Sequence, residues 1–319
     1  MKASVIIPTK NPGKQFRNVL QAVLTQETPW AFEVLVVDSG STDGTVEWLE
    51  SLEGVGLRQI PPSDFGHGKT RNFAIGQTSG EFVAVITHDA LPANEHWLLE
   101  LVTAVEQSDD VAGAFGRHLA YAHDGPFTER DLRLHFDGFL AWPEIMTLED
   151  KERYQTDEGY RQLLHYFSDN NACLRRKVWE KIPYPDVDFA EDQLWAKQVI
   201  EAGYAKAFSN KAVVFHSHSY GFINLFRRSF DESRALNRLF GYQLCPTLLQ
   251  MFGQSFRTMI ADVRYFFGSR IPLTELIWLL RSPFRNTAKQ FGFYLGQRHQ
   301  RLPEFMVERI SIDMSLQRK

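Results

Sequence analysis

The 319-residue sequence is poor in cysteine and has no long apolar run. Its two cysteines, Cys173 and Cys245, are too few and too far apart for a disulfide framework or a thiolate zinc cluster, which fits a reducing cytoplasm. No stretch of about eighteen uncharged apolar residues is present that could form a transmembrane helix. The N-terminus also lacks the basic flank and apolar core of a signal peptide, so secretion is not expected.

The rest of the composition is that of a folded globular protein. Hydrophobic residues make up 44% of the chain and charged residues 23%, which indicates neither disorder nor a fibrous structure. The charge is unevenly distributed, because residues 1–220 hold 20 basic and 32 acidic residues whereas residues 221–319 hold 15 and 7. A basic, aromatic-rich last third is typical of a membrane surface or a nucleic-acid site, and also of a solvated face on ordinary helices.

Short apolar runs alternate with helical patterns from the start of the chain. Residues 4–8, 32–37 and 80–86 are short apolar runs of the kind that form buried parallel strands, and the first is β-branched. The spacing of apolar residues predicts helices at residues 16–26 and 45–52. This order predicts an α/β fold with a mostly parallel, Rossmann-like sheet flanked by helices, in which ligands bind beyond the carboxyl ends of the strands.

The later part of the chain is less regular. Helices are predicted at residues 95–107 and 191–201, and strands at residues 111–116, 170–174 and 213–216. Residues 121–166 have no clear period, and we interpret them as a mobile insertion that covers the substrate. From residue 222 onward only helices are predicted, separated by prolines, at residues 222–240, 246–267, 273–281 and 286–299.

Asp38 ends the second predicted strand and is followed by Ser-Gly-Ser-Thr-Asp-Gly. A carboxylate here, beside small residues that let a ligand approach the backbone, can accept a hydrogen bond from a base or a ribose. The alternative is an Asx turn between strand and helix, which explains the residue better when it is taken alone.

A second polar segment, residues 66–72, places two glycines beside three potential cations. A phosphate group would be stabilised by exposed amides, by Arg71 and by a helix that begins at Thr70 or Asn72. The segment matches neither a P-loop nor the dinucleotide-binding glycine pattern. The alternative is a surface loop with helix-capping residues.

Carboxylates follow two further elements. Asp89 comes directly after a buried strand, where it suits a divalent cation that bridges two phosphates, and oxygen ligands favour Mg²⁺ or Mn²⁺. His216 and His218 alternate along an extended segment and could complete the site, although a structural role is the alternative for each. Asp192 follows Glu191 at the start of a helix, where acidic residues are common, yet a spare carboxylate could deprotonate an acceptor hydroxyl.

The sequence resembles glycosyltransferase family two, and within it the bacterial rhamnosyltransferase-like branch. The resemblance covers about residues 1–220 and lies in seven segments in the family's order: Ser-Val-Ile-Ile-Pro-Thr at 4–9, Val-Val-Asp-Ser-Gly-Ser-Thr-Asp at 36–43, Phe-Gly-His-Gly-Lys-Thr-Arg-Asn at 65–72, Thr-His-Asp-Ala at 87–90, Asn-Asn at 170–171, Ala-Glu-Asp at 190–192 and His-Ser-His at 216–218. The first two specify the family, and the third points to the branch.

The resemblance implies a GT-A fold and an inverting single displacement. Asp192 would be the catalytic base, and Asp89 would hold the metal with help from His216 and His218. Arg71 would bind the diphosphate. The residues expected at the nucleotide sugar are Pro8, Thr9, Asn11, Asp38, Gly40, Ser41, Gly66, His67, Arg71 and His88. The donor-sugar or acceptor side would be lined by Asn170, Asn171, Glu191 and Trp195.

Two positions depart from the family's pattern. Thr87 stands where the family usually has the first carboxylate of Asp-x-Asp, and Asn11 stands where many relatives have Glu. The branch tolerates a threonine at the first position, so activity is still expected.

The resemblance also implies a division of the chain. Residues 1–220 would be the GT-A domain, with a nucleotide-sugar half at about 1–116 and an acceptor half at about 117–220. Residues 221–319 are more vaguely similar to helical tails that lie on the inner membrane surface. They would hold a cytoplasmic enzyme on that surface, form a homodimer interface, or do both.

The expected function is transfer of a sugar, L-rhamnose from dTDP-rhamnose, to a surface-polysaccharide or polyprenyl-diphosphate-linked acceptor. The alternative is a non-catalytic nucleotide-sugar-fold partner in a membrane-associated assembly complex. Four retained residues, Asp38, Arg71, Asp89 and Asp192, favour the enzyme because a scaffold has no use for them together. No nucleic-acid-binding motif accompanies the basic tail, so no nucleic-acid partner is expected.

Overall fold

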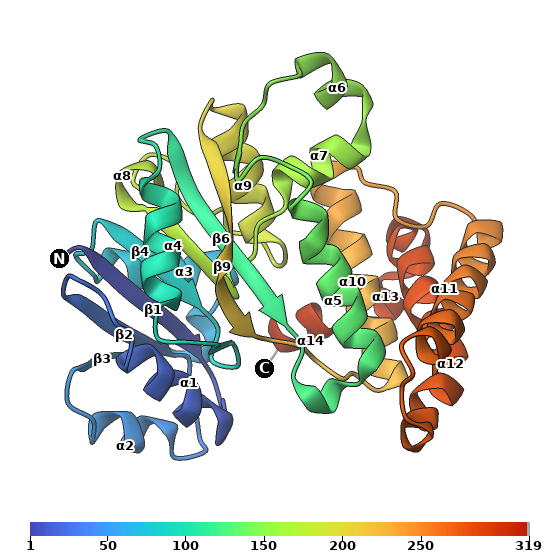
Figure 1. Ribbon diagram of the computed structural model, residues 1–319, viewed down its shortest axis with the longest axis horizontal. Coiled ribbons are helices and arrows are strands. Elements are labelled where there is room, and N and C mark those ends of the chain that lie inside the picture. Colours follow the sequence, from blue (N-terminus) through green and yellow to red (C-terminus); the bar gives the residue numbers. More distant parts are fainter. Residues whose placement is uncertain (318–319) are drawn as a thin grey trace. The chain divides into compact units, whose positions relative to one another are not determined.

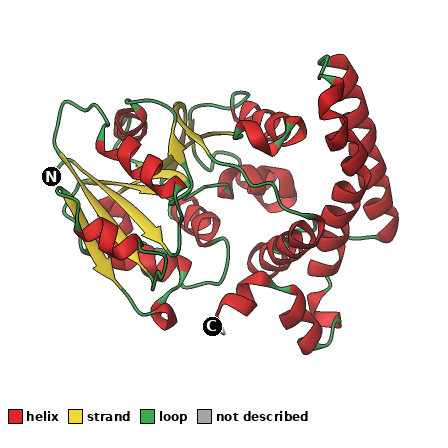
Figure 2. Ribbon diagram, turned by 90° about the horizontal axis from the view of Figure 1, so that it is seen from below, coloured by secondary structure: helices red, strands yellow, loops and turns green. Residues whose placement is uncertain are grey.

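The computed structural model describes residues 1–317, which divide into two compact units (Figure 1). The first unit consists of Met1–Tyr121, Leu132–Val187 and Glu191–Ser217. The second consists of Ala122–Asp131, Asp188–Ala190 and the chain from His218 onward. Among the described residues every strand lies in the first unit, and the second is helical (Figure 2).

The first unit is built on one sheet with the strand order β3-β2-β1-β4-β8-β6-β9-β5, and β7 pairs with β9. The strands are β1 (Ala3–Thr9), β2 (Phe32–Asp38), β3 (Val55–Gln59), β4 (Phe82–Ile86), β5 (Leu91–Pro92), β6 (Val111–Leu119), β7 (Ile145–Met146), β8 (Asn171–Arg175) and β9 (Ala205–Phe215). From β3 to β4 all neighbours are parallel, which brings their carboxyl ends to one edge. Beyond β4 the sheet is mixed, because β8 runs antiparallel to both β4 and β6.

Helices cover both faces of this sheet. One face packs against α1 (Gln15–Leu24), α2 (Thr45–Glu50) and α4 (Trp97–Glu106), and the other against α3 (His67–Gly76), α7 (Glu158–His165) and α9 (Glu191–Glu201). Within β1, Val5 and Ile7 join the first core and Ile6 joins the second, as the two-residue repeat of a strand requires. A strand buried on both faces explains why the sequence reads as a continuous apolar run.

The segment at residues 121–166, in which the sequence shows no clear period, is mostly helical. It contains α5 (Pro126–Phe139), α6 (Lys151–Thr156), the strand β7 and α7. Phe136 and Leu164 pack into the second core beside Phe115 of β6. Its helices are mostly short and each contributes only a few core side chains, so the sequence shows no extended periodic pattern. The remaining short helix of this unit is α8 (Arg176–Trp179).

The second unit contains α10 (Phe222–Phe240), α11 (Leu248–Gly268), α12 (Leu276–Gly296), α13 (Glu304–Ile310) and α14 (Ile312–Gln317). Helix α12 packs closely on α10, since a Cβ added at Gly292 or Gly296 would lie 2.4 or 2.3 Å from a backbone oxygen of α10. In the described part of the chain, no helix combines the length and apolarity needed to cross a bilayer.

The predicted break at Pro283 is wrong, because α12 continues through this residue. Pro283 is exposed, so water can hydrate the carbonyl group that loses its helical donor.

Candidate active site

The loops after β1 and β2 are tied together at the carboxyl edge of the sheet. The backbone N–H of Asn11 donates to Ser41 Oγ over 2.7 Å, and Asn11 Oδ1 accepts from the N–H of Thr42 over 2.7 Å. Asn11 adopts a left-handed backbone conformation (φ +45°), which asparagine tolerates better than most residues. Asn11, expected at the nucleotide, is thus a residue that joins the two loops.

Asp38, at the end of β2, closes its own loop. Its Oδ1 accepts from the N–H groups of Gly40 and Ser41 over 2.9 and 2.8 Å, and the Ser41 hydroxyl donates to Oδ2. Gly40 has a φ of +91°, and a Cβ there would lie 2.7 Å from Pro62 Cγ. The Asx-turn alternative therefore describes the observed contacts of Asp38, which shape the loop beside the site.

Two threonine hydroxyls at the same edge are buried without a hydrogen-bond partner. They belong to Thr9, the last residue of β1 after the half-buried Pro8, and to Thr87, which follows β4 and precedes the half-buried His88. A buried hydroxyl without a hydrogen-bond partner lowers the stability of the fold by about 1–3 kcal/mol. A ligand that hydrogen-bonds to the hydroxyl would remove this loss.

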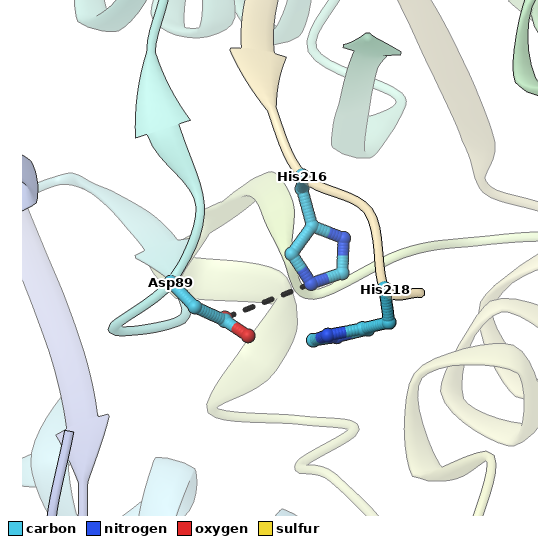
Figure 3. Close-up of side chains that lie close together, drawn as sticks. All are labelled: Asp89, His216 and His218. Carbon is cyan, nitrogen blue, oxygen red and sulfur yellow. Dashed lines mark ion pairs between the residues drawn. The ribbon is translucent and has the colours of Figure 1, made fainter. Parts of the chain in front are cut away.

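Asp89 and His216 face each other beyond the ends of β4 and β9 (Figure 3). His216 Nε2 lies 3.6 Å from Asp89 Oδ1. The hydroxyl of Tyr121 donates to the backbone oxygen of Asp89 over 3.0 Å and so fixes the turn that carries it. His218 follows two residues after His216, and one ligand atom from each of the three residues lies within 4.8 Å of the others. These residues could hold one divalent cation.

Residues 66–72, where a phosphate-binding loop is predicted, lie almost wholly within helix α3. Helix α3 begins at His67, before the expected start at Thr70 or Asn72, with Gly66 at its N-cap. This start places Arg71 on the same buried stripe as Gly68, Ala74 and Ile75. The Arg71 side chain is 7% exposed, with Nη1 2.6 Å from Glu191 Oε1 and Nε 3.1 Å from Asp169 Oδ2. Its guanidinium is therefore committed to two carboxylates.

The same face of α3 holds the segment before α9. Asn72 Nδ2 donates to the backbone oxygen of Tyr184 over 2.8 Å, and Asn72 Oδ1 accepts from the Tyr184 N–H over 3.0 Å. A Cβ added at Gly68 would lie 2.3 Å from the backbone oxygen of Pro185. Only glycine lets the two backbones approach this closely at Gly68.

Asp192 lies in the first turn of α9, which begins directly after Ala190 in a left-handed conformation (φ +58°). Its Oδ2 accepts from the backbone N–H of Asp169 over 3.2 Å, and its Oδ1 accepts from the N–H of Gln193 over 2.7 Å. Asp169 in turn accepts from the hydroxyl of Tyr184 over 2.6 Å. Asp192 is half-buried, whereas Asp169 and Tyr184 are buried.

Three carboxylates thus lie near one guanidinium, which forms ion pairs with Asp169 and Glu191 and acts on Asp192 through its charge. Burial raises the pKa of Asp192 well above its usual value, and the negative charges of Glu191 and Asp169 raise it further, while Arg71 opposes the change. Burial also raises the pKa of Asp169 to about 6 against the opposing charge of Arg71. A carboxylate with a raised pKa is a stronger base, as proton abstraction near neutral pH requires.

Two residues expected to line the sugar side are instead fixed in the fold. Asn171 is fully buried: its Oδ1 accepts from Trp97 Nε1 over 2.7 Å, and its Nδ2 donates to the backbone oxygens of Arg117 and Ala212. Trp195 is also fully buried and donates to the backbone oxygen of Ile182 over 2.8 Å. Neither side chain can line a ligand site in this structure, because helix and strand phase turn both into the core. Asn170 is half-buried in the turn before β8.

Sequence reasoning missed Asp169 and Tyr184. Asp169 directly precedes the Asn-Asn pair at 170–171, and that adjacency was the only local signal for it. Its contacts with Arg71 and Asp192 span 98 and 23 positions, so no short-range pattern predicts them.

Comparison with known proteins identifies a family for most of the first unit. The model of the family described as Glycosyl transferase family 2 matches residues 4–182. The chain is 30% identical over 312 residues to the O-antigen chain rhamnosyltransferase RfbN of Salmonella typhimurium, covering 95% of this chain and 92% of that protein. It is 29% identical over 308 residues to the O-antigen chain rhamnosyltransferase WbaN of Salmonella anatum, covering 94% and 90%.

Two solved structures have the same fold at low sequence identity. The mannosyltransferase PcManGT of Pyrobaculum calidifontis, in complex with GDP-Man and Mn²⁺, aligns with a TM-score of 0.59 at 18% identity, covering 94% of this chain and 86% of that one. TarS 1–349 of S. aureus aligns with a TM-score of 0.51 at 19% identity, covering 94% and 91%.

Proposed function

Because the chain belongs to glycosyl transferase family 2 and is a glycosyltransferase, we propose that it transfers L-rhamnose from dTDP-rhamnose to a hydroxyl group of an O-antigen or other surface-polysaccharide acceptor, free or linked to polyprenyl diphosphate. The observation that carries this proposal is the similarity to two O-antigen chain rhamnosyltransferases over at least 94% of the chain. The family and the GT-A fold expected from the sequence are confirmed. Both relatives are transferases, so nothing favours the non-catalytic alternative.

The proposed chemistry is a single displacement with inversion. The acceptor oxygen would attack the anomeric carbon of the donor sugar while the bond from that carbon to the diphosphate oxygen breaks. The acceptor proton would pass to a carboxylate oxygen of Asp192, and the nucleoside diphosphate would leave with the bonding electron pair. The raised pKa of Asp192 supports this role, since a carboxylate with a higher pKa is a better proton acceptor.

We propose Asp89 and His216, with His218, as the residues that would hold a divalent cation. Their donor set, one carboxylate and two imidazoles, fits Mn²⁺ better than Mg²⁺, which prefers oxygen ligands. When bound, the cation would stabilise the charge that develops on the leaving diphosphate. The unpaired hydroxyls of Thr9 and Thr87 would bind and orient the donor at the same edge of the sheet.

We propose that the second unit holds the enzyme at the inner membrane surface through one face of α11 and α12. Each of these helices carries a stripe of exposed apolar side chains: Leu249, Phe252, Phe256, Val263 and Phe267 on α11, and Leu273, Ile277, Leu280 and Phe284 along α12 and the turn before it. Residues 248–298 hold seven basic and two acidic residues, and one of the acidic residues, Asp262, is buried against Arg130. Anionic lipid suits this combination, and a homodimer interface is the alternative.

The donor proposal can be tested by nucleotide release. The purified protein would be incubated with dTDP-rhamnose, UDP-GlcNAc or GDP-mannose, with and without a lipid-linked oligosaccharide acceptor. We expect acceptor-dependent release from dTDP-rhamnose at least about tenfold faster than from the other two, because a pocket shaped for one sugar separates transition states by 1.4 kcal/mol or more. Equal or faster release from another donor would overturn the rhamnose assignment and leave the transferase assignment intact.

A further inference from the structure

We propose that Arg71 and Asp169 are positioning residues that set the orientation and basicity of Asp192, and that Arg71 is not a ligand of the donor diphosphate. This inference rests on the proposed role of Asp192 as base. It begins from the burial of Arg71, whose guanidinium contacts carboxylates of this chain from inside the first unit.

The contacts form a chain that ends at the base. Helix α3 supplies Arg71, which contacts Glu191 at the start of α9 and Asp169 in the turn before β8. The backbone N–H of Asp169 then donates directly to Asp192 Oδ2. Arg71 Nε and Asp169 Oδ2 lie 3.1 Å apart without a well-directed hydrogen bond, so their contact is electrostatic. Asp192 is therefore held from the turn before β8 as well as by its own helix.

The charges around Asp192 are few and can be named. Asp169 comes from the turn before β8, Glu191 from α9 and Arg71 from α3, and Tyr184 adds a hydroxyl that hydrogen-bonds to Asp169. The two carboxylates favour protonation of Asp192 and the guanidinium opposes it. These charges fix the direction in which each substitution changes the pKa of Asp192. Loss of a carboxylate lowers this pKa, and loss of the guanidinium raises it.

Two variants should therefore change the pKa of Asp192 in opposite directions. Asp169→Asn keeps the shape, the backbone N–H and an acceptor for Tyr184, but removes one negative charge. The acid limb of the pH profile, where kcat falls because Asp192 becomes protonated, should move to lower pH by about one unit in this variant. Arg71→Met leaves three carboxylates without a cation, so its acid limb should move to higher pH by a similar amount.

Donor binding separates the two roles of Arg71. A positioning residue lowers kcat and shifts the pH profile while the donor Kd, measured by calorimetry, stays within about threefold of wild type. A diphosphate ligand would raise that Kd tenfold or more and leave the acid limb in place. Arg71→Lys keeps the positive charge but loses the planar guanidinium group with its paired N–H donors. Its acid limb should therefore stay near that of wild type, while kcat itself falls. Arg71→Lys also tests the role of Arg71 if the Arg71→Met variant does not fold.

The control is Glu180→Gln, which removes an exposed carboxylate of the same unit and should leave the pH profile unchanged. The proposal is overturned if Asp169→Asn has the wild-type acid limb, or if Arg71→Lys loses donor affinity with its acid limb unmoved. Failure of the base assignment looks different, because Asp192→Asn would then keep its turnover whatever the two positioning variants do.

Discussion

The backbone N–H of Asp169 donates a hydrogen bond to Asp192 Oδ2 over 3.2 Å, which joins two carboxylate-bearing residues that are 23 positions apart. The contact leaves the Asp169 side chain free to face Arg71 and Tyr184. Asp192 is thereby held at the start of α9 next to other negative charge, which a purely structural carboxylate would avoid. The cost of this arrangement points to a chemical use for Asp192.

The first prediction concerns Asp192→Asn. The amide has the same shape and cannot accept the proton, so turnover should fall by about a hundredfold or more, the usual contribution of a positioned base. The donor Kd should change little, because the substitution leaves the residues at the ends of β1, β2 and β4 intact. Steady-state turnover with an oligosaccharide acceptor and donor titration by calorimetry check the two parts. A turnover within about threefold of wild type would remove Asp192 from the mechanism.

The second prediction compares two glycines of α3. A Cβ at Gly68 would lie 2.3 Å from the backbone oxygen of Pro185, whereas nothing lies within 4 Å of one at Gly76. Gly68→Ala should therefore lower the free energy of unfolding by about 1–3 kcal/mol and reduce turnover, since the segment before α9 must move. Gly76→Ala, the matched control, should be neutral or stabilising by up to about 1 kcal/mol. Urea unfolding measures both, and equal midpoints for the two variants would contradict a tight contact at Gly68.

Much of the fold follows from local patterns in the sequence, and the orientation of single side chains does not. The run around Val5 predicts a buried strand because both of its faces meet helices. The segment containing Arg71 was expected to begin a helix at Thr70 or Asn72, but the helix begins at His67, and this start turns Arg71 inward. Helix phase thus decides whether an arginine binds a ligand or supports the residues that do.

The third prediction concerns the cation. EDTA should weaken donor binding to the wild type by at least about tenfold, and Mn²⁺ should restore it at lower concentration than Mg²⁺, because two imidazoles accompany one carboxylate. Asp89→Ala should bind the donor as weakly as the EDTA-treated wild type and should not respond to EDTA. Glu95→Ala, which removes an exposed carboxylate from the loop before α4, should behave as wild type. Calorimetry that shows metal-independent donor affinity in the wild type would exclude a cation from donor binding.

The last prediction concerns the apolar face of α11 and α12. Arginine beside an anionic leaflet contributes about 1 kcal/mol each and is screened by salt, whereas an apolar interface between two copies should be nearly insensitive to salt. We therefore expect the protein to co-sediment with anionic vesicles at low ionic strength and to be released at high ionic strength.

The double variant Phe252→Ser/Phe256→Ser should weaken this binding at both salt concentrations, because it removes two side chains that are 62% and 59% exposed on that face. Leu134→Ser, which removes a similarly exposed apolar side chain from the first unit, should not weaken it. A dimer that resists salt and ignores vesicles would identify the face as an interface between two copies, and a monomer that ignores vesicles at low salt would contradict both roles.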